Sequence, residues 1–217
     1  MNKKATNKKK NPVKNTPKSL YHHGDLARAL VIAGREILRE KGTDGLSLRA
    51  VAAKAGVSQS APYTHFKNKK DLLRAIGASG FAELSGNMIK NESSKDTALD
   101  IIITRGVAYI EFALNNPDIY RLMFAQVDPN GHKRHRREFP SESDVFTIEA
   151  IKAYKLLHSS CESLCTDENK ATIYSLGIWG LVHGLASLIT ENLIKIPTTD
   201  RRVFIKELLA NQIQSIE

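Results

Sequence analysis

Four consecutive residues in the N-terminal third of the chain carry side chains suited to reading the edges of DNA bases: Ser58, Gln59, Ser60 and Ala61. The Gln59 amide donates and accepts hydrogen bonds in one plane, as a bidentate contact with adenine requires. The two serine hydroxyls can reach bases or phosphates, and the Ala61 methyl can touch a thymine methyl. We therefore predict that this tetrad enters the major groove of double-stranded DNA.

Polar and basic side chains flank the tetrad on both sides in the sequence. They are suited to contact phosphates, which fix the position of a protein on DNA without reading its sequence. The predicted phosphate contacts are Ser47, Arg49, Tyr63, Thr64, His65, Lys67 and Lys69.

Two short helices joined by a tight turn are needed to present the tetrad, and the sequence supplies their signals. Ser47 stands at an N-cap position, and its helix runs to Gly56, which can take the left-handed conformation of a tight turn. We expect Ser58 to cap the second helix, with Pro62 at about its fourth position, where a proline forfeits at most one early backbone bond. In such a helix-turn-helix the first helix braces the second, which enters the groove. Helix pairs with a glycine turn also arise by chance.

The charge distribution supports a polyanionic partner for the N-terminal part of the chain. The 217 residues carry a formal net charge of +9. Residues 1–70 hold 16 Lys and Arg against 4 Asp and Glu, whereas residues 71–217 hold 16 against 19. Seven of the lysines fall within residues 1–19, a segment without acids that we expect to be disordered in isolation. This tail is either a solubilising segment or an arm that contacts phosphates.

The rest of the sequence is helical in pattern, so the predicted fold class is all-α. Further helices are predicted over about 25–41, 69–90, 97–115, 118–125, 142–164, 168–194 and 199–216. No run alternates with period two for long enough to predict a strand. Residues 128–141 are a loop by composition, and their basic run, Lys133–Arg137, is more typical of a solvated loop than of a second nucleic-acid site.

Residues 21–76 resemble the DNA-binding domain of the TetR family of bacterial repressors. The resemblance is carried by Leu48–Ala52, Ala55–Ser58, Tyr63–Phe66, and Lys69 followed by Asp71–Leu73. It implies base contacts near Gln59, Ser60 and Ala61, and phosphate contacts from Arg49, Tyr63, His65 and Lys69. The chain departs from the usual pattern at Ala61–Tyr63, where most members carry leucine or another non-proline residue before the tyrosine. This variant is similar to a subgroup with a Trp-x-x-x-His-Gly element in its C-terminal domain, which is present here at Trp179–Gly184.

The resemblance also implies an organisation for the whole chain. It implies a homodimer that binds a palindromic operator and releases it when a small-molecule effector fills the C-terminal domain. The expected divisions are a disordered basic tail (1–19), a three-helix helix-turn-helix DNA-binding domain (20–68) and a larger helical effector-binding and dimerisation domain (69–217).

Residues 171–190 hold no charged side chain and are about long enough to span a bilayer. The glycines, the histidine and the hydroxyls among them favour a buried helix of a soluble domain instead. Gly177, Gly180, Gly184 and Ser187 recur at steps of three or four, so small residues line one face of this helix. An interior glycine costs about 1 kcal/mol relative to alanine, which makes sense where another helix approaches closely. That helix belongs either to a second subunit or to the same chain.

Trp179 and His183 lie one turn apart on this helix and are candidates for the wall of an effector pocket. The other candidates are Tyr109, Phe112, Tyr120, Met123 and Phe124. Taken singly, each is more typical of a core residue, whereas the resemblance implies a cavity in the domain as a whole. Because few fixed charges line the predicted pocket, we expect a small apolar or aromatic effector.

Other classes of function have weaker support. The sequence holds no glycine-rich phosphate loop, no Gly-x-Ser-x-Gly elbow, no His-Glu-x-x-His and no convincing pair of carboxylates, so we predict no enzyme activity. Cys161 and Cys165 are four residues apart without a second Cys or His pair nearby, so we expect reduced thiols, no metal and no cofactor. The charged N-terminus has no apolar core behind it, so we expect a cytoplasmic, nucleoid-associated protein without a membrane partner. The competing function is a sequence-indifferent architectural DNA binder led by the lysine tail.

Overall fold

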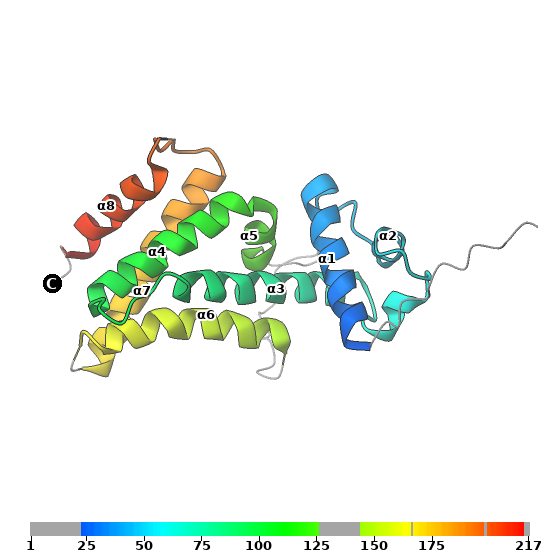
Figure 1. Ribbon diagram of the computed structural model, residues 1–217, viewed down its shortest axis with the longest axis horizontal. Helices are drawn as coiled ribbons and strands as arrows, with labels where there is room; N and C mark the ends of the chain where they lie inside the picture. Colours follow the sequence, from blue (N-terminus) through cyan, green and yellow to red (C-terminus); the bar gives the residue numbers. More distant parts are fainter. Residues whose placement is uncertain (1–22, 126–143, 166, 198, 215–217) are drawn as a thin grey trace, which may run out of the picture.

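The computed structural model describes residues 23–125, 144–165, 167–197 and 199–214, and within these ranges all of the regular secondary structure is helical (Figure 1). The elements are α1 (His23–Lys41), α2 (Leu48–Lys54), the 3₁₀ helix η1 (Ala61–Thr64), α3 (Lys69–Ile89), α4 (Ala98–Asn115), α5 (Pro117–Phe124), α6 (Val145–Glu162), α7 (Glu168–Thr190) and α8 (Arg201–Gln214). No strand occurs in the described ranges, which confirms the all-α prediction. The tail at 1–19 and the loop at 128–141 lie outside the described residues.

The helices α1 and α2, together with η1, form a small unit around a shared apolar core, in which Leu30 of α1 and Val51 of α2 are fully buried. Ser47 caps α2 as predicted, since its Oγ accepts a hydrogen bond from the Ala50 N–H at 3.1 Å. Gly56 has a φ of 70°, the left-handed conformation that its turn requires. The bracing helix and its turn are therefore confirmed.

The second helix of the predicted pair is shorter than expected and is not an α-helix. Ser60 stands at the N-cap of η1, so the prediction that Ser58 caps an α-helix is wrong. The Ser58 hydroxyl instead lies 3.2 Å from the Ser60 hydroxyl. Pro62 sits in the first turn of η1 rather than at a fourth helical position, and its missing N–H is not needed there. Its carbonyl accepts hydrogen bonds from the N–H groups of His65 and Phe66, which close the turn.

Helix α3 is shared by both halves of the molecule. It begins at Lys69, capped by the Asn68 side chain, and runs beside α6 while also packing against α1, α4 and α5 (Figure 1). Helix α1 crosses it so closely that a Cβ on Gly34 would lie 2.7 Å from the Cδ1 of Ile76. On the far side of the molecule α4 packs against α7 and α8. One continuous helix thus connects the small N-terminal unit to the larger bundle.

Among the described helices, α7 alone is long and apolar enough to cross a membrane, by length and composition. Helix α7 packs on α4 and α6, yet only 22% of its apolar 18-residue stretch is buried. Gly177, Gly180 and Gly184 have open space where a Cβ would stand, with no neighbouring element within 4 Å. Ile173 and Leu176 on the same helix are 66% and 52% exposed. Among the described residues, no helix of this chain packs on the glycine stripe.

Candidate nucleic-acid interface and effector site

The predicted base-reading tetrad lies on an exposed edge of the N-terminal unit. Ser58, Gln59 and Ser60 are exposed, whereas Ala61 is half-buried. The residues that hold this edge in place are buried beneath it: Val51, Ala52, Pro62 and Phe66. Packing therefore fixes the position of the edge, while its polar groups face solvent.

The cations predicted to contact phosphate differ in whether their side chains already have a hydrogen-bond partner. Arg49 and Lys67 are exposed, and within the described residues neither side chain has a hydrogen bond or an ion pair. The Lys69 Nζ donates to the Thr43 carbonyl at 2.6 Å, so this side chain also ties the start of α3 to the loop before α2. An ammonium group has three donors, and two of them remain for a phosphate.

Two further lysines near this surface were not among the predicted contacts. The Lys54 ammonium lies 2.8 Å from Glu40, and this hydrogen bond raises the pKa of Lys54 above its ordinary value. Its charge is therefore already compensated within the chain. Lys70 is exposed without a described partner at the start of α3, and its place directly after Lys69 is the sequence signal that could have identified it.

Three of the predicted contacts lie on or beside η1 and differ in what they can offer a phosphate. Tyr63 is 54% exposed. The Thr64 hydroxyl donates to the Ala61 carbonyl at 2.7 Å, so its single proton is engaged. The Nε2 of His65 is buried and has no partner within the described residues. A phosphate contact is thus geometrically direct for Tyr63 and requires a rearrangement at Thr64.

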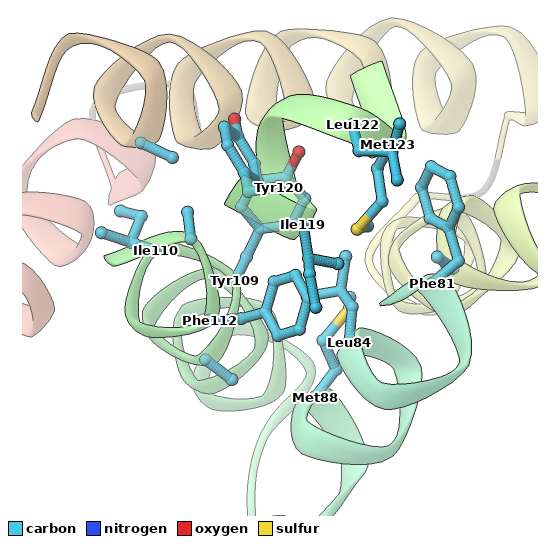
Figure 2. Close-up of a cluster of buried hydrophobic side chains, with 14 of the residues drawn as sticks. Phe81, Leu84, Met88, Tyr109, Ile110, Phe112, Ile119, Tyr120, Leu122 and Met123 are labelled. Atoms are coloured by element: carbon cyan, nitrogen blue, oxygen red, sulfur yellow. The ribbon is translucent and has the colours of Figure 1, made fainter. Parts of the chain in front are cut away.

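Four of the residues predicted to line an effector pocket, from α4, α5 and α7, meet around one imidazole ring. The Nδ1 atom of His183 lies 2.9 Å from the hydroxyl oxygens of both Tyr109 and Tyr120. The Tyr120 hydroxyl also lies 3.2 Å from that of Ser187. The Phe124 ring lies against the histidine, with 4.5 Å between the ring centroids. Figure 2 shows the two tyrosines side by side, with their hydroxyl oxygens directed toward α7.

Burial keeps this cluster uncharged near neutral pH. Desolvation raises the pKa of the Tyr109 and Tyr120 hydroxyls above the usual range and lowers the pKa of His183. In a neutral imidazole each ring nitrogen carries either one N–H or one lone pair, so Nδ1 has the capacity for one full hydrogen bond, although two tyrosine hydroxyls lie within reach of it. The polar group of a ligand could replace either hydroxyl at this nitrogen.

Of the other three candidates, Trp179 contacts the cluster through a side-chain hydrogen bond with Tyr109. Phe112 and Met123 are buried in the core, and the Met123 Sδ would lie 2.6 Å from a Cβ on Gly80 of α3. The Trp179 ring packs against Tyr154 of α6, with 5.3 Å between the ring centroids. Sequence reasoning did not assign Ser187 to this site, although its position one turn after His183 is a signal that could have done so.

Cys161 and Cys165 are free thiols near the end of α6. Burial raises the pKa of the Cys161 thiol to about 11. Within the part of the chain that the structure describes, no group of three or more His, Cys, Asp or Glu side chains is placed to hold a metal ion.

Comparison with known protein families matches both halves of the chain. Residues 30–76 match the family described as bacterial regulatory proteins, tetR family. Residues 102–211 match the family described as tetracyclin repressor-like, C-terminal domain. The two matches include α2, η1 and most of the helices of the larger bundle.

Individual relatives are transcriptional regulators. YobS, an uncharacterised HTH-type transcriptional regulator of Bacillus subtilis, is 26% identical over 193 residues that cover 85% of this chain and 93% of that protein. The tetracycline repressor protein class A from transposon 1721 in Escherichia coli is 43% identical over 54 residues, 25% of each chain.

Solved structures share the fold over nearly the whole length. A protein of unknown function from Rhodococcus sp. RHA1 is 25% identical, with a TM-score of 0.68 and coverage of 90% of this chain and 98% of that one. A TetR protein from Acinetobacter baumannii in complex with minocycline is 18% identical, with a TM-score of 0.58 and coverage of 86% of this chain and 93% of that one.

Proposed function

The chain belongs to the TetR family of bacterial transcriptional regulators, and we propose that it is a ligand-responsive repressor that binds a palindromic operator as a homodimer. The observation that carries the proposal is the exposed edge formed by Ser58, Gln59 and Ser60, which α2 braces. This edge offers hydrogen-bonding groups to bases, and the exposed Arg49 of α2, which has no partner within the described residues, offers a cation to phosphate. The remaining predicted DNA contacts belong to the same proposal, with Thr64 the least direct of them.

Dimerisation is supported by the outer face of α7 and its neighbour α8. The glycines Gly177 and Gly180 would let a second helix approach closely, and large apolar side chains lie exposed on both helices. Those apolar side chains are Ile173, Leu176, Leu188, Val203 and Phe204. Operator binding then requires the two-fold axis to set the two reading edges about one DNA turn, roughly 34–36 Å, apart.

For the effector site we propose the cluster around His183, with a small apolar or aromatic molecule that carries one polar group. The aromatic rings supply the apolar wall, and the His183 Nδ1 with its tyrosine hydroxyls supplies the polar anchor. The minocycline bound to the Acinetobacter protein is a property of that protein, which is 18% identical to this chain. Release from DNA requires only that the effector bind better to a conformation with a different spacing of the reading edges.

We also propose the division of the chain into a tail at 1–19, a DNA-binding domain at 20–68 and an effector-binding and dimerisation domain at 69–217. Within the family, the Trp179–Gly184 element and the proline at position 62 support placement in the subgroup that carries such an element.

Titration of the full chain against DNA from its own promoter region, at about 150 mM salt, tests the proposal. We expect a complex about 1,000-fold or more tighter than the complex with random DNA of the same length. Equal affinity for the two DNAs contradicts it. The alternative of a sequence-indifferent architectural protein is not favoured, because the relatives are transcriptional regulators. Deletion of residues 1–19 separates the two: near-total loss of binding indicates the architectural protein, and a weakened but still specific complex indicates the regulator.

A further inference from the structure

A groove of about 800 Å³ lies at the junction of the two halves of the molecule, lined by none of the residues around His183. Its walls come from α1, from the segment that follows η1, from α3 and from the start of α6. Figure 1 shows the N-terminal end of α6 approaching α1 at this junction. The volume lies within the range of about 300–1,000 Å³ that is typical of small-molecule sites.

The floor of this junction groove is apolar and partly aromatic. Val31 and Ile32 of α1 and Ala78 of α3 contribute aliphatic surface, and Phe66 and Phe146 contribute two rings. Ile32 is 48% exposed in the described structure. Such a floor suits the apolar body of a ligand rather than a free inorganic ion.

Among the described residues, the charged groups of the junction groove leave two cations and one acid without an ion-pair partner. Asp144 is paired with Arg74 and Glu149 with Lys152, whereas Asp71 accepts a hydrogen bond from the Lys67 backbone N–H and keeps its charge. Arg35 is likewise paired, with Glu83. The side chains of Arg28 and Lys67 have no partner within the described residues. The electrostatics therefore favour an anionic ligand.

An unpartnered polar atom belongs to the same wall. The Nε2 of His65 is buried without a hydrogen bond in the described structure, and His65 lines the groove. Buried polar groups in folded proteins are normally hydrogen-bonded, and because this atom is shielded from solvent, a ligand in the groove reaches it only after an adjustment of the wall.

We propose that the junction groove binds a small organic anion, with its carboxylate or sulfonate at Arg28 and Lys67 and its apolar or aromatic body against Phe66 and Phe146. This site is separate from the proposed effector cluster around His183. A ligand here touches the segment directly after η1 and the start of α6 at once, so it favours one arrangement of the two halves. The resulting change in operator affinity rests on the proposed function, whereas the binding itself does not.

Isothermal titration of the full chain with naphthoate tests the site, with neutral naphthalene methanol as the control for charge. Ala82→Trp fills the groove from an exposed position on α3, and we expect it to abolish binding. Arg28→Gln removes one of the two unpaired cations, and we expect it to weaken binding about fivefold. Arg39→Gln removes the same charge from the same helix outside the groove, so we expect naphthoate binding to survive this substitution. Titration of His183→Ala separates binding in the groove from binding at the other cluster.

Several results would overturn the site. These are no naphthoate binding below about 1 mM, equal binding of the neutral alcohol, or unchanged binding by an Ala82→Trp protein whose circular dichroism and thermal transition match the parent chain. Ile32→Trp is a second occluding variant if Ala82→Trp does not fold. Loss in His183→Ala alone assigns the anion to the effector cluster, and loss in Arg39→Gln assigns it to a smaller hollow of about 360 Å³ beside Pro117. A chain that binds naphthoate here but no operator contradicts the proposed function and leaves the groove intact.

Discussion

Asp144, the N-cap of α6, accepts a hydrogen bond from the Arg74 Nε of α3 at 3.2 Å, so the capping residue of one helix is bound to the side of another. The Arg74 guanidinium also lies 5.0 Å from the centroid of the Phe146 ring. Burial alone raises the pKa of Asp144, but the hydrogen bonds from Arg74 and Thr147 outweigh it and hold the pKa below its ordinary value. The folded chain therefore favours the charged carboxylate.

Asp144→Asn is expected to lower the free energy of unfolding by about 1 kcal/mol near neutral pH. Asparagine caps a helix about as well as aspartate but lacks the charge that Arg74 meets. Because the unfolded pKa is about 3.9 and the folded pKa is lower, the contribution is complete above about pH 4 and is lost as the pH falls through the folded value. Urea unfolding of the two proteins should converge toward acid pH. Equal stability at neutral pH would contradict the role of the pair.

Arg49→Ala is expected to weaken binding to operator and random DNA alike, because the side chain is an exposed cation with no partner within the described residues and is suited to phosphate. One lost phosphate contact reduces the slope of log affinity against log salt by about 0.9. Fluorescence anisotropy at several salt concentrations measures this slope. Lys54→Gln is the matched control, because Glu40 already compensates that lysine. The same change of slope in both variants would argue against a specific contact from Arg49.

Gln59→Ala is expected to act on specificity instead. Loss of a bidentate contact with a base costs about 1–3 kcal/mol on the operator and little on random DNA. Competition against operators changed at one base pair at a time should show relaxed preference at a single position. A uniform loss across all DNAs would mean that Gln59 contacts the backbone and not a base.

Gly180→Leu is expected to shift the chain from dimer to monomer, because the position faces open space in one chain and the proposed partner helix in the dimer. Gly86 of α3 also has open space around it and provides the control Gly86→Leu. Both substitutions favour the helix by roughly 1 kcal/mol, so neither should unfold the monomer. Sedimentation velocity distinguishes the species. A Gly180→Leu protein that remains dimeric at the same concentrations would move the interface elsewhere.

The histidine at the centre of the tyrosine cluster is expected to make stability depend on pH. Desolvation lowers the pKa of His183, so the unfolded chain takes up a proton at higher pH than the folded chain does. Stability is then complete above about pH 6.5 and declines as the pH falls through the folded pKa. Thermal unfolding followed from about pH 7 to 5 should show a larger decline for the parent chain than for His183→Gln. Equal declines in the stability of the two proteins would show that other histidines dominate the pH dependence.

The helices could be predicted from sequence because the signals that start and stop them are local. Ser47 caps α2 from three residues away, and Gly56 needs only its own conformation to end the turn. The 3₁₀ geometry of η1 could not be predicted, because Pro62 is as compatible with the first turn of an α-helix as with a 3₁₀ helix. The 3₁₀ geometry consists of hydrogen bonds that span three residues, from the Tyr63 N–H to the Ser60 carbonyl and from the His65 N–H to the Pro62 carbonyl.

The residue types at the candidate sites could be predicted, but the hydrogen bonds and contacts that their side chains make could not. The sequence placed Lys69 among the cations predicted to contact phosphate. It could not show the hydrogen bond from the Lys69 Nζ to the Thr43 carbonyl, because the two residues are 26 positions apart. The meeting of Tyr109, Tyr120 and His183 depends on the packing of three helices. The junction groove has no local signal at all, because Arg28 and Phe146 are brought together only by the way α1 and α6 pack on α3.

The unbroken course of α3 has a mechanical consequence. Its 21 residues make a rod about 30 Å long, so a tilt of about 5° displaces one end relative to the other by about 2.6 Å. The rod rests at Gly80, where a Cβ would lie 2.6 Å from the Met123 Sδ and 2.7 Å from the Ile119 Cγ2 of α5. Because Gly80 has no side chain, the backbone of α3 lies directly against α5 at this position. The Lys69 end of α3 lies about 16 Å from Gly80, so a tilt of about 5° about Gly80 displaces that end, where the DNA-binding unit begins, by about 1.4 Å.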